Sequence, residues 1–262
     1  MKTNPILLLV LLVLFASCEK VIDVDLNKAT PQIVIEANLL EGTHNFKVRV
    51  SQTSSYFDNQ ASPAIINAHV ILHDSSNTME LQNSGNGYYQ LENYTAVSNA
   101  NYILTVTVDG NSYNATSFMP PAVELDSLIY EYVPNADVSQ SGYRVMCSWK
   151  DPINVTNYYR LISSKNNVAE LKSNNLIALE DRLSDGLSVT VPLYSTIYQE
   201  NDTVKVSLLS IDKNGYDYFN TLSQVAMNNN GTAPANPNTN FTGGALGYFV
   251  AASSSDKTII IK

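Results

Sequence analysis

Apolar and polar residues alternate along most of the chain, and turn-forming residues separate the alternating segments. A period of two places successive side chains on opposite faces of a strand, so one face of each segment can be buried. The pattern predicts strands at residues 32–39, 45–51, 101–110, 187–193 and 202–211. Short antiparallel strands with one buried face are typical of β-sandwiches. We therefore predict a mainly β protein.

The same alternation predicts which residues face the core. In the first three strands they are Ile33, Ile35, Ala37, Leu39, Phe46, Val48, Val50, Tyr102, Leu104, Val106 and Val108. Residues 143–149 also alternate, with Val145, Cys147 and Trp149 on one face. Cys147 is therefore predicted to be a core thiol. A nucleophilic role would need a nearby histidine, and the histidines lie far away in sequence, at positions 44, 69 and 73.

Two prolines suggest how the chain divides into domains. Pro120 and Pro121 interrupt the alternating pattern, and proline lacks a backbone donor and holds the residue before it extended. We predict a domain boundary at this point. Residues 28–119 would form an N-terminal, Ig-like antiparallel β-sandwich, and residues 122–262 a C-terminal sandwich of usual domain size.

One segment of the second domain has helical periodicity. Its apolar residues recur at steps of three and four: Tyr216, Phe219, Leu222 and Ala226. The spacing predicts one short helix over 215–227, with Asn214 as its cap and Asp217 in its first turn. Residues 228–240 are polar and rich in asparagine and proline, which predicts a long loop that is either functional or disordered.

The start of the chain resembles a lipoprotein signal. A single run of ten apolar residues follows Lys2 and ends at Phe15, which is too short for a transmembrane helix of about 20 residues but typical of a signal peptide. Ala16-Ser17-Cys18 then resembles a bacterial lipobox, although Phe15 replaces the usual leucine. The alternative is an ordinary secretory signal followed by a chance cysteine.

The lipobox resemblance implies a membrane anchor. Residues 1–17 would be removed, Cys18 would carry diacylglycerol and further acyl chains such as palmitate, and residues 18–27 would form a tether. Two or more acyl chains anchor a protein stably, because each buried CH₂ contributes about 0.8 kcal/mol. Lipidation of Cys18 would also leave Cys147 without a disulfide partner, since the chain has only 2 cysteines.

Composition and motifs exclude several functions. The chain has 24 acidic and 15 basic residues, which argues against nucleic-acid binding, because Lys and Arg contacts to phosphate dominate that affinity. His69 and His73 have zinc-like spacing only on a helix; on the strand that the pattern predicts they lie ~13 Å apart. Glu180, Asp181 and Asp185 lack calcium-loop spacing and read as a solvated turn. We expect no metal and no cofactor.

The chain also lacks the Gly-x-Ser-x-Gly, His-Glu-x-x-His, phosphate-loop and dinucleotide motifs. We therefore expect that the protein is not an enzyme. Asp126-Ser127-Leu128 and Asp202-Thr203-Val204 resemble the O-glycosylation triplets of Bacteroidota, but both lie in predicted strands, and we attribute them to chance.

Two family resemblances extend this interpretation. "VMCSWKDP" followed by "TNYYRLI" is similar to two core strands of a fibronectin type III domain. The whole chain resembles a lipoprotein family of Bacteroidota catalogued as domain of unknown function 4249, through "SCEKVIDVDL", "IVIEANL", "DTVKVSLLSIDKNGYDYFNTL" and "TGGALGYFVAASSSDKTI". The resemblance implies an outer-membrane lipoprotein, often encoded beside TonB-dependent receptors. It implies no catalytic residue.

We therefore expect a lipid-anchored, non-catalytic accessory protein at the bacterial outer membrane, on its periplasmic or its surface face, with a TonB-dependent receptor as partner. The alternative is an autonomous glycan- or peptide-binding module, which a row of exposed tyrosines beside residues 228–240 would favour. A structural role in the envelope is a further alternative. The residues expected to contact a partner are Tyr216, Tyr218, Asn230, Pro234 and Pro237.

Overall fold

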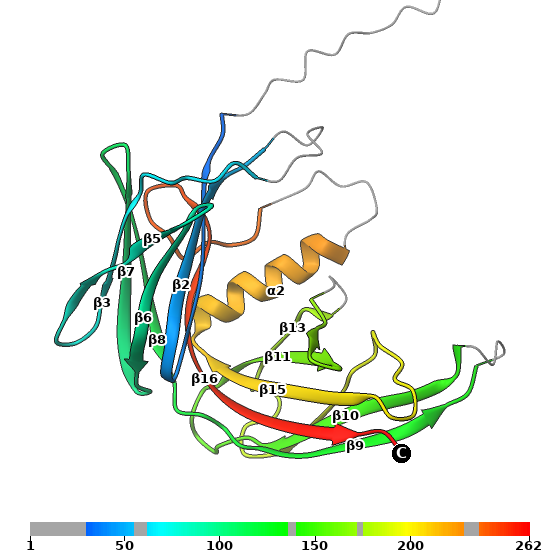
Figure 1. Ribbon diagram of the computed structural model, residues 1–262. Coiled ribbons are helices and arrows are strands. Elements are labelled where there is room, and N and C mark those ends of the chain that lie inside the picture. The colour runs from blue at the N-terminus through cyan, green and yellow to red at the C-terminus, as the bar shows by residue number, and fades with distance from the viewer. Residues whose placement is uncertain (1–29, 55–61, 136–139, 172–174, 228–235) are drawn as a thin grey trace, which may run out of the picture. The chain divides into compact units, whose positions relative to one another are not determined.

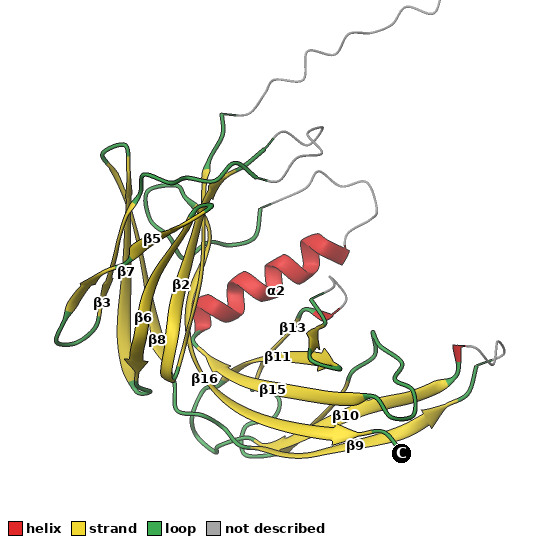
Figure 2. Cartoon of the chain, in the orientation of Figure 1, coloured by secondary structure: helices red, strands yellow, loops and turns green. Residues whose placement is uncertain are grey.

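The computed structural model describes residues 30–54, 62–135, 140–171, 175–227 and 236–262. Residues 31–262 form one compact unit, and this unit is mainly β with helix α2, as predicted (Figure 1; Figure 2). The elements are β1 Ile33–Leu40, β2 Gly42–Gln52, β3 His69–His73, β4 Thr78–Glu80, β5 Gln82–Gly85, β6 Tyr88–Ala96, β7 Ala100–Val108, β8 Asn111–Met119, β9 Leu125–Val133, β10 Gly142–Lys150, β11 Tyr158–Lys165, β12 Val168–Ala169, β13 Ile177–Glu180, β14 Ser188–Pro192, β15 Thr203–Ile211, α2 Lys213–Met227 and β16 Leu246–Ile260.

Three sheets organise the described strands. The largest has the order β12-β11-β15-β16-β1-β2-β6-β5, with β13 paired to β11, and the others have the orders β14-β10-β9 and β4-β3-β7-β8. Pairing is mostly antiparallel, and the alternation that predicted the strands matches their burial. Core positions such as Ile35, Val48, Leu104 and Trp149 are at most 1% exposed. One pair departs from the antiparallel prediction, because β1 and β16 run parallel.

Strand β16 belongs to two parts of the unit. Its first half pairs with β1 over residues 246–252, and its second half pairs with β15 over residues 253–260. Phe249 therefore packs in one core with Ile35, whereas Ile261, just beyond the strand, packs in a second core with Trp149. The boundary expected at residues 120–121 falls between β8 and β9, and β16 spans it.

The segment after Pro120 is bonded to the sheet by serines. Ser253 Oγ donates to the carbonyl oxygen of Pro120 at 2.7 Å, and the backbone N–H of Leu125 donates to Ser255 Oγ at 2.9 Å. Ser210 Oγ accepts from the N–H of Val123 at 3.2 Å. These hydrogen bonds satisfy backbone groups of the segment that would otherwise lack a partner. The segment is thus part of the packed unit rather than a free linker.

Helix α2 differs from its sequence prediction at its start. The cap is Asp212, whose Oδ1 accepts from the N–H of Gly215 at 2.8 Å, so the prediction of Asn214 as cap was wrong. Asp217 lies beyond the first turn and pairs with Lys213 at 2.6 Å. Tyr218 is buried as well as Phe219, because both residues lie where α2 packs on β11, β13 and β16.

Candidate functional site

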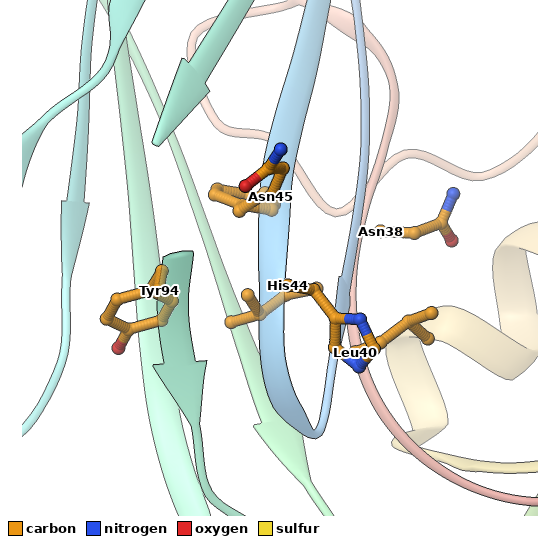
Figure 3. Close-up of a pocket in the computed structure, with 7 residues that line it drawn as sticks. Asn38, Leu40, His44, Asn45 and Tyr94 are labelled. Carbon is orange, nitrogen blue, oxygen red and sulfur yellow. The ribbon is translucent and has the colours of Figure 1, made fainter. Parts of the chain in front are cut away.

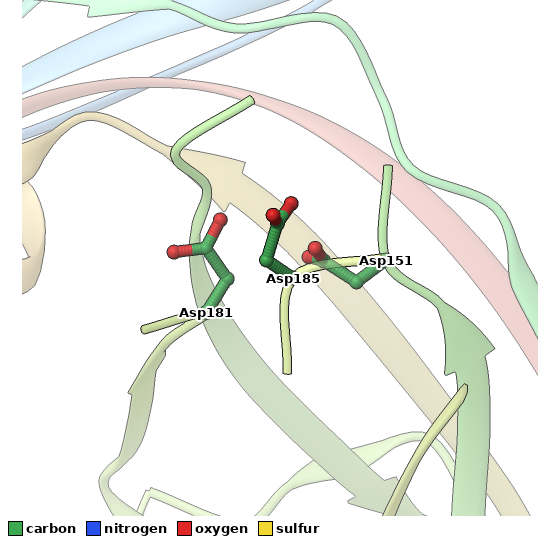
Figure 4. Close-up of side chains that lie close together, drawn as sticks. All are labelled: Asp151, Asp181 and Asp185. Atoms are coloured by element: carbon green, nitrogen blue, oxygen red, sulfur yellow. The ribbon is translucent and has the colours of Figure 1, made fainter. Parts of the chain in front are cut away.

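Three aspartates lie close together near the end of β10. Asp151 directly follows β10, Asp181 directly follows β13, and Asp185 lies in the turn after β13 (Figure 4). Each offers a carboxylate oxygen, and these oxygens lie within 4.8 Å of one another. Asp151 and Asp181 are 1% and 5% exposed. We call these three residues the aspartate trio.

Hydrogen bonds hold the trio in place, with Asp151 and Asp181 buried and Asp185 exposed beside them. Asp151 accepts from Tyr159 Oη at 2.5 Å and from the N–H of Gly186 at 3.2 Å. Burial, with this hydrogen bond to Asp151, raises the pKa of Tyr159 well above its ordinary value, so the phenol stays a donor. Asp181 and Asp185 accept from the backbone N–H groups of Asn157 and Asn154, both at 2.7 Å.

The trio therefore connects two loops, residues 151–157 and residues 181–187, which we call the loop pair. Calcium sites use about six to eight oxygens. In the trio, only one oxygen of Asp181 and one of Asp185 receive no hydrogen bond from a described residue. The carboxylates act mainly as fixed acceptors for loop backbone. Alternation along the strands gave no sign of Asp151. Glu180, which the sequence grouped with Asp181 and Asp185, pairs instead with Arg182 at 3.2 Å.

The loop pair also exposes large aliphatic side chains. Their exposed fractions are 69% for Ile153, 54% for Val155, 88% for Leu183 and 59% for Leu187. The two loops touch, since a Cβ at Gly186 would lie 3.0 Å from Ile153, and the N–H of Asp151 donates to the carbonyl of Leu187 at 2.9 Å. Apolar residues gathered on a rigid surface are typical of interaction sites.

A small pocket lies at the turn between β1 and β2 (Figure 3). Its volume is about 220 Å³, below the roughly 300–1,000 Å³ of ordinary ligand pockets. The residues that line it are Asn38, Leu39, Leu40, His44, Asn45, Phe46 and Tyr94. His44 Nε2 bonds the carbonyl of Glu41 at 2.9 Å. Tyr94 donates to Asp74 at 2.8 Å, and its pKa is raised by burial and by this bond. His44 and Tyr94 therefore bond to different groups and do not form an acid–base pair with each other.

The residues predicted to contact a partner lie in different places. Tyr216 is half-buried with its ring 5.2 Å from that of Tyr158, and Tyr218 is 8% exposed. Pro237 is half-buried beside Asn238, whose N–H donates to Thr221 Oγ1 at 2.9 Å. Asn230, Pro234 and Cys18, with residues 1–17 and 18–27, lie outside the described residues. Among the described residues, α2 carries no row of exposed tyrosines.

The histidine and cysteine predictions agree with the structure. His69 and His73 lie on strand β3, where they contact Glu80 at 3.3 Å and Thr78 at 3.0 Å respectively. Cys147 is buried, and burial raises the pKa of its thiol to about 11, which keeps it protonated at neutral pH. Within the described part of the chain, no helix has the length and apolar character needed to cross a membrane.

Comparison with known proteins yields a family but no activity. No curated protein matches the chain. A family model matches residues 19–258, which is nearly the whole chain and includes the loop pair, the pocket and α2. The chain therefore belongs to the family described as domain of unknown function (DUF4249).

Proposed function

We propose that this protein is a lipid-anchored, non-catalytic interaction protein at the outer membrane of a bacterium of the Bacteroidota, with a TonB-dependent receptor as partner. The lipobox-like Ala16-Ser17-Cys18 supports the anchor. We also propose a fibronectin type III-like arrangement for the second core, in which the rings of Trp149 and Tyr159 pack edge to face at 5.4 Å.

The loop pair is the observation that carries the proposed interaction. Its four aliphatic side chains are exposed at the surface, where burial against a partner would contribute about 25 cal/mol per Å². The aspartate trio holds the loops in place by accepting backbone N–H groups. Because a preorganised surface loses less conformational entropy on binding, these residues suit a docking role.

Replacing Ile153 and Leu183 together by serine should release the partner. We expect recovery of the TonB-dependent receptor from mildly cross-linked outer membranes to fall at least ~10-fold, as two buried anchor residues typically contribute 1 kcal/mol or more each. The measurement is affinity purification of the tagged protein followed by mass spectrometry. The matched control replaces Ile66 and Val168, which are 65% and 69% exposed elsewhere, by serine. Unchanged recovery with the loop-pair variant would contradict the proposal.

Thiol counting tests the proposed anchor. While it is folded, the protein purified from membranes should not react with a thiol reagent, because Cys147 is buried and its thiol has a pKa of about 11. On denaturation we expect one reactive thiol per chain, since acylated Cys18 has no free sulfur. Cys147→Ala should then show none. Two reactive thiols in the denatured protein would mean that Cys18 is not lipidated.

A further inference from the structure

One arginine lies beneath helix α2 in a cluster of aromatic rings. Arg160 is on β11, and its guanidinium carbon is 3.6 Å from the ring centroid of Phe219. The ring of Tyr248 lies 5.0 Å from Phe219 and 4.6 Å from Tyr218. These contacts bring β11, β16 and α2 together around one positive charge. Phe219 covers one face of the guanidinium, which is a cation–π contact.

Arg160 differs from the other described arginines because no described acidic residue pairs with it. Arg49, Arg144 and Arg182 each pair with a glutamate at 3.2–3.4 Å. Among the described residues, none forms an ion pair or a hydrogen bond with the Arg160 side chain. Among the described residues, the fully buried side-chain polar atoms without a hydrogen-bond partner belong to Arg144, Trp149 and Asn175. The nitrogens of Arg160 are not fully buried in this way. Solvent therefore reaches the guanidinium.

The cation–π contact leaves the hydrogen-bond donors of Arg160 unused. The five N–H groups of a guanidinium point outward in its plane, whereas Phe219 contacts its face. Burial lowers the pKa of Arg160, because the charge has lost part of its hydration. A group in this position gains from an acceptor that replaces the lost water.

Two phenols beside Arg160 add further donors. Tyr218 and Tyr248 lie close enough to interact electrostatically with its charge. Burial raises the pKa of both, so both keep their protons at neutral pH. Tyr248 Oη accepts from Asn38 Nδ2 at 2.9 Å, which leaves its own O–H to donate. The guanidinium and the phenols together form a group of hydrogen-bond donors.

We propose that Arg160, with Tyr218 and Tyr248, binds the carboxylate of a ligand. A carboxylate is planar and accepts two parallel N–H bonds from a guanidinium. A doubly charged phosphate is disfavoured, because Glu36 acts electrostatically on both phenols and the chain has a net charge of −9. The carboxylate comes from a peptide C-terminus or an acidic sugar. This inference is independent of the proposed docking of the loop pair.

NMR titration of the arginine side chains tests the site directly. The full-length protein with ¹⁵N-labelled arginine is titrated with N-acetylalanine and with glucuronate. Neutral matched probes are N-acetylalanine amide and glucose, and inorganic phosphate tests selectivity for charge. We expect the Nε–H signal of Arg160 to shift saturably with a carboxylate and not with the neutral probes. The carboxylate that saturates at the lower concentration identifies the source. No saturable shift with either one would overturn the proposal.

Variants separate ligand binding from packing. We expect Arg160→Gln to weaken binding at least ~10-fold, since hydrogen bonds to a charged group are lost. Tyr248→Phe keeps the ring and should weaken binding severalfold. Arg144→Gln is the matched control, because Arg144 also lies over a tyrosine, 4.8 Å from the ring centroid of Tyr194, but pairs with Glu131. These affinities are read from probe signals by saturation-transfer NMR.

If Arg160→Gln does not fold, Arg160→Lys and Tyr248→Phe decide the question, because Arg160→Lys keeps the charge and Tyr248→Phe keeps the ring. Wild-type affinity in the folded variants, or an equal loss in Arg144→Gln, would show that Arg160 only packs against Phe219 and would overturn the proposal.

Discussion

Gly247→Ala is expected to prevent the chain from folding, or to lower its free energy of unfolding by about 3–5 kcal/mol. Gly247 has φ +95°, a conformation that L side chains rarely adopt, and it faces Ile35 in the parallel pair of β1 and β16. A Cβ at this position would overlap the carbonyl oxygen of Ile35. The atom it meets is backbone, so only a separation of the two strands would relieve the overlap.

This separation would reach beyond the two strands. The first half of β16 contributes Phe249 and Ala251 to the core that contains Ile35, and the same strand continues to β15. Urea unfolding followed by the fluorescence of Trp149, the only tryptophan, measures the loss. Gly244→Ala is the matched control, because Gly244 has φ +84° but nothing within 4 Å of its Cβ position. It should cost about 1 kcal/mol of backbone strain. Equal losses in the two variants would contradict the steric explanation.

Asp212→Ala should lower the free energy of unfolding by about 3–4 kcal/mol, because this carboxylate satisfies donors from two elements. Oδ1 caps α2 through the N–H of Gly215, at 2.8 Å. Oδ2 accepts from Ser117 Oγ and from the N–H of Phe118 on β8, both at 2.9 Å. Ser117 Oγ in turn accepts from the N–H of Ala251 on β16 at 2.9 Å. Truncation would leave a helix end and the part-buried N–H of Phe118 unpaired.

The control for this prediction is Asp217→Ala. Asp217 lies on the same helix and pairs with Lys213 at 2.6 Å, but the pair is exposed, and exposed i,i+4 pairs contribute only about 0.3–0.5 kcal/mol. Thermal and urea unfolding of both variants give the comparison. A loss below 1 kcal/mol in Asp212→Ala would show that water replaces the carboxylate at both elements.

Local patterns in the sequence were sufficient for the strands. Alternation identified the buried faces of β1, β2, β7 and β10, because the side-chain period of a strand is a property of the backbone itself. Asp109 and Gly110 form the turn that joins β7 to β8. Both residues have positive φ, +49° and +81°, which a two-residue hairpin between β7 and β8 requires and which these residue types tolerate.

Helix α2 shows what local sequence patterns cannot predict. Periodicity located α2 to within two residues at its start. The cap was missed, because Asp212 follows directly after β15 and Asn214 looked equally suitable as an N-cap. Tyr218 was expected to contact a partner, yet packing against Tyr248 buries it. A single helix can present aromatic residues on two faces, and only its neighbours decide which face is covered.

The features on which the two proposals depend all require contacts between distant residues. Asp151 joins Asp181 only because β10 and β13 end beside each other, 30 residues apart in the chain. Arg160 has no acidic partner among the described residues, because α2, β11 and β16 bring aromatic side chains to it. Alternation predicts which face of a strand is buried, but it does not indicate which residues pack against that face.

The amino-acid sequence alone therefore established the β-rich class, the buried faces, the core thiol and the lipobox resemblance at Cys18. These depend on backbone periodicity and on short motifs, which act over a few residues. The parallel pairing of β1 with β16, the loop pair and the aromatic surroundings of Arg160 were decided by the tertiary structure. The reason is physical: alternation specifies that a face must be buried, but the partner that buries it is selected by packing of the whole chain.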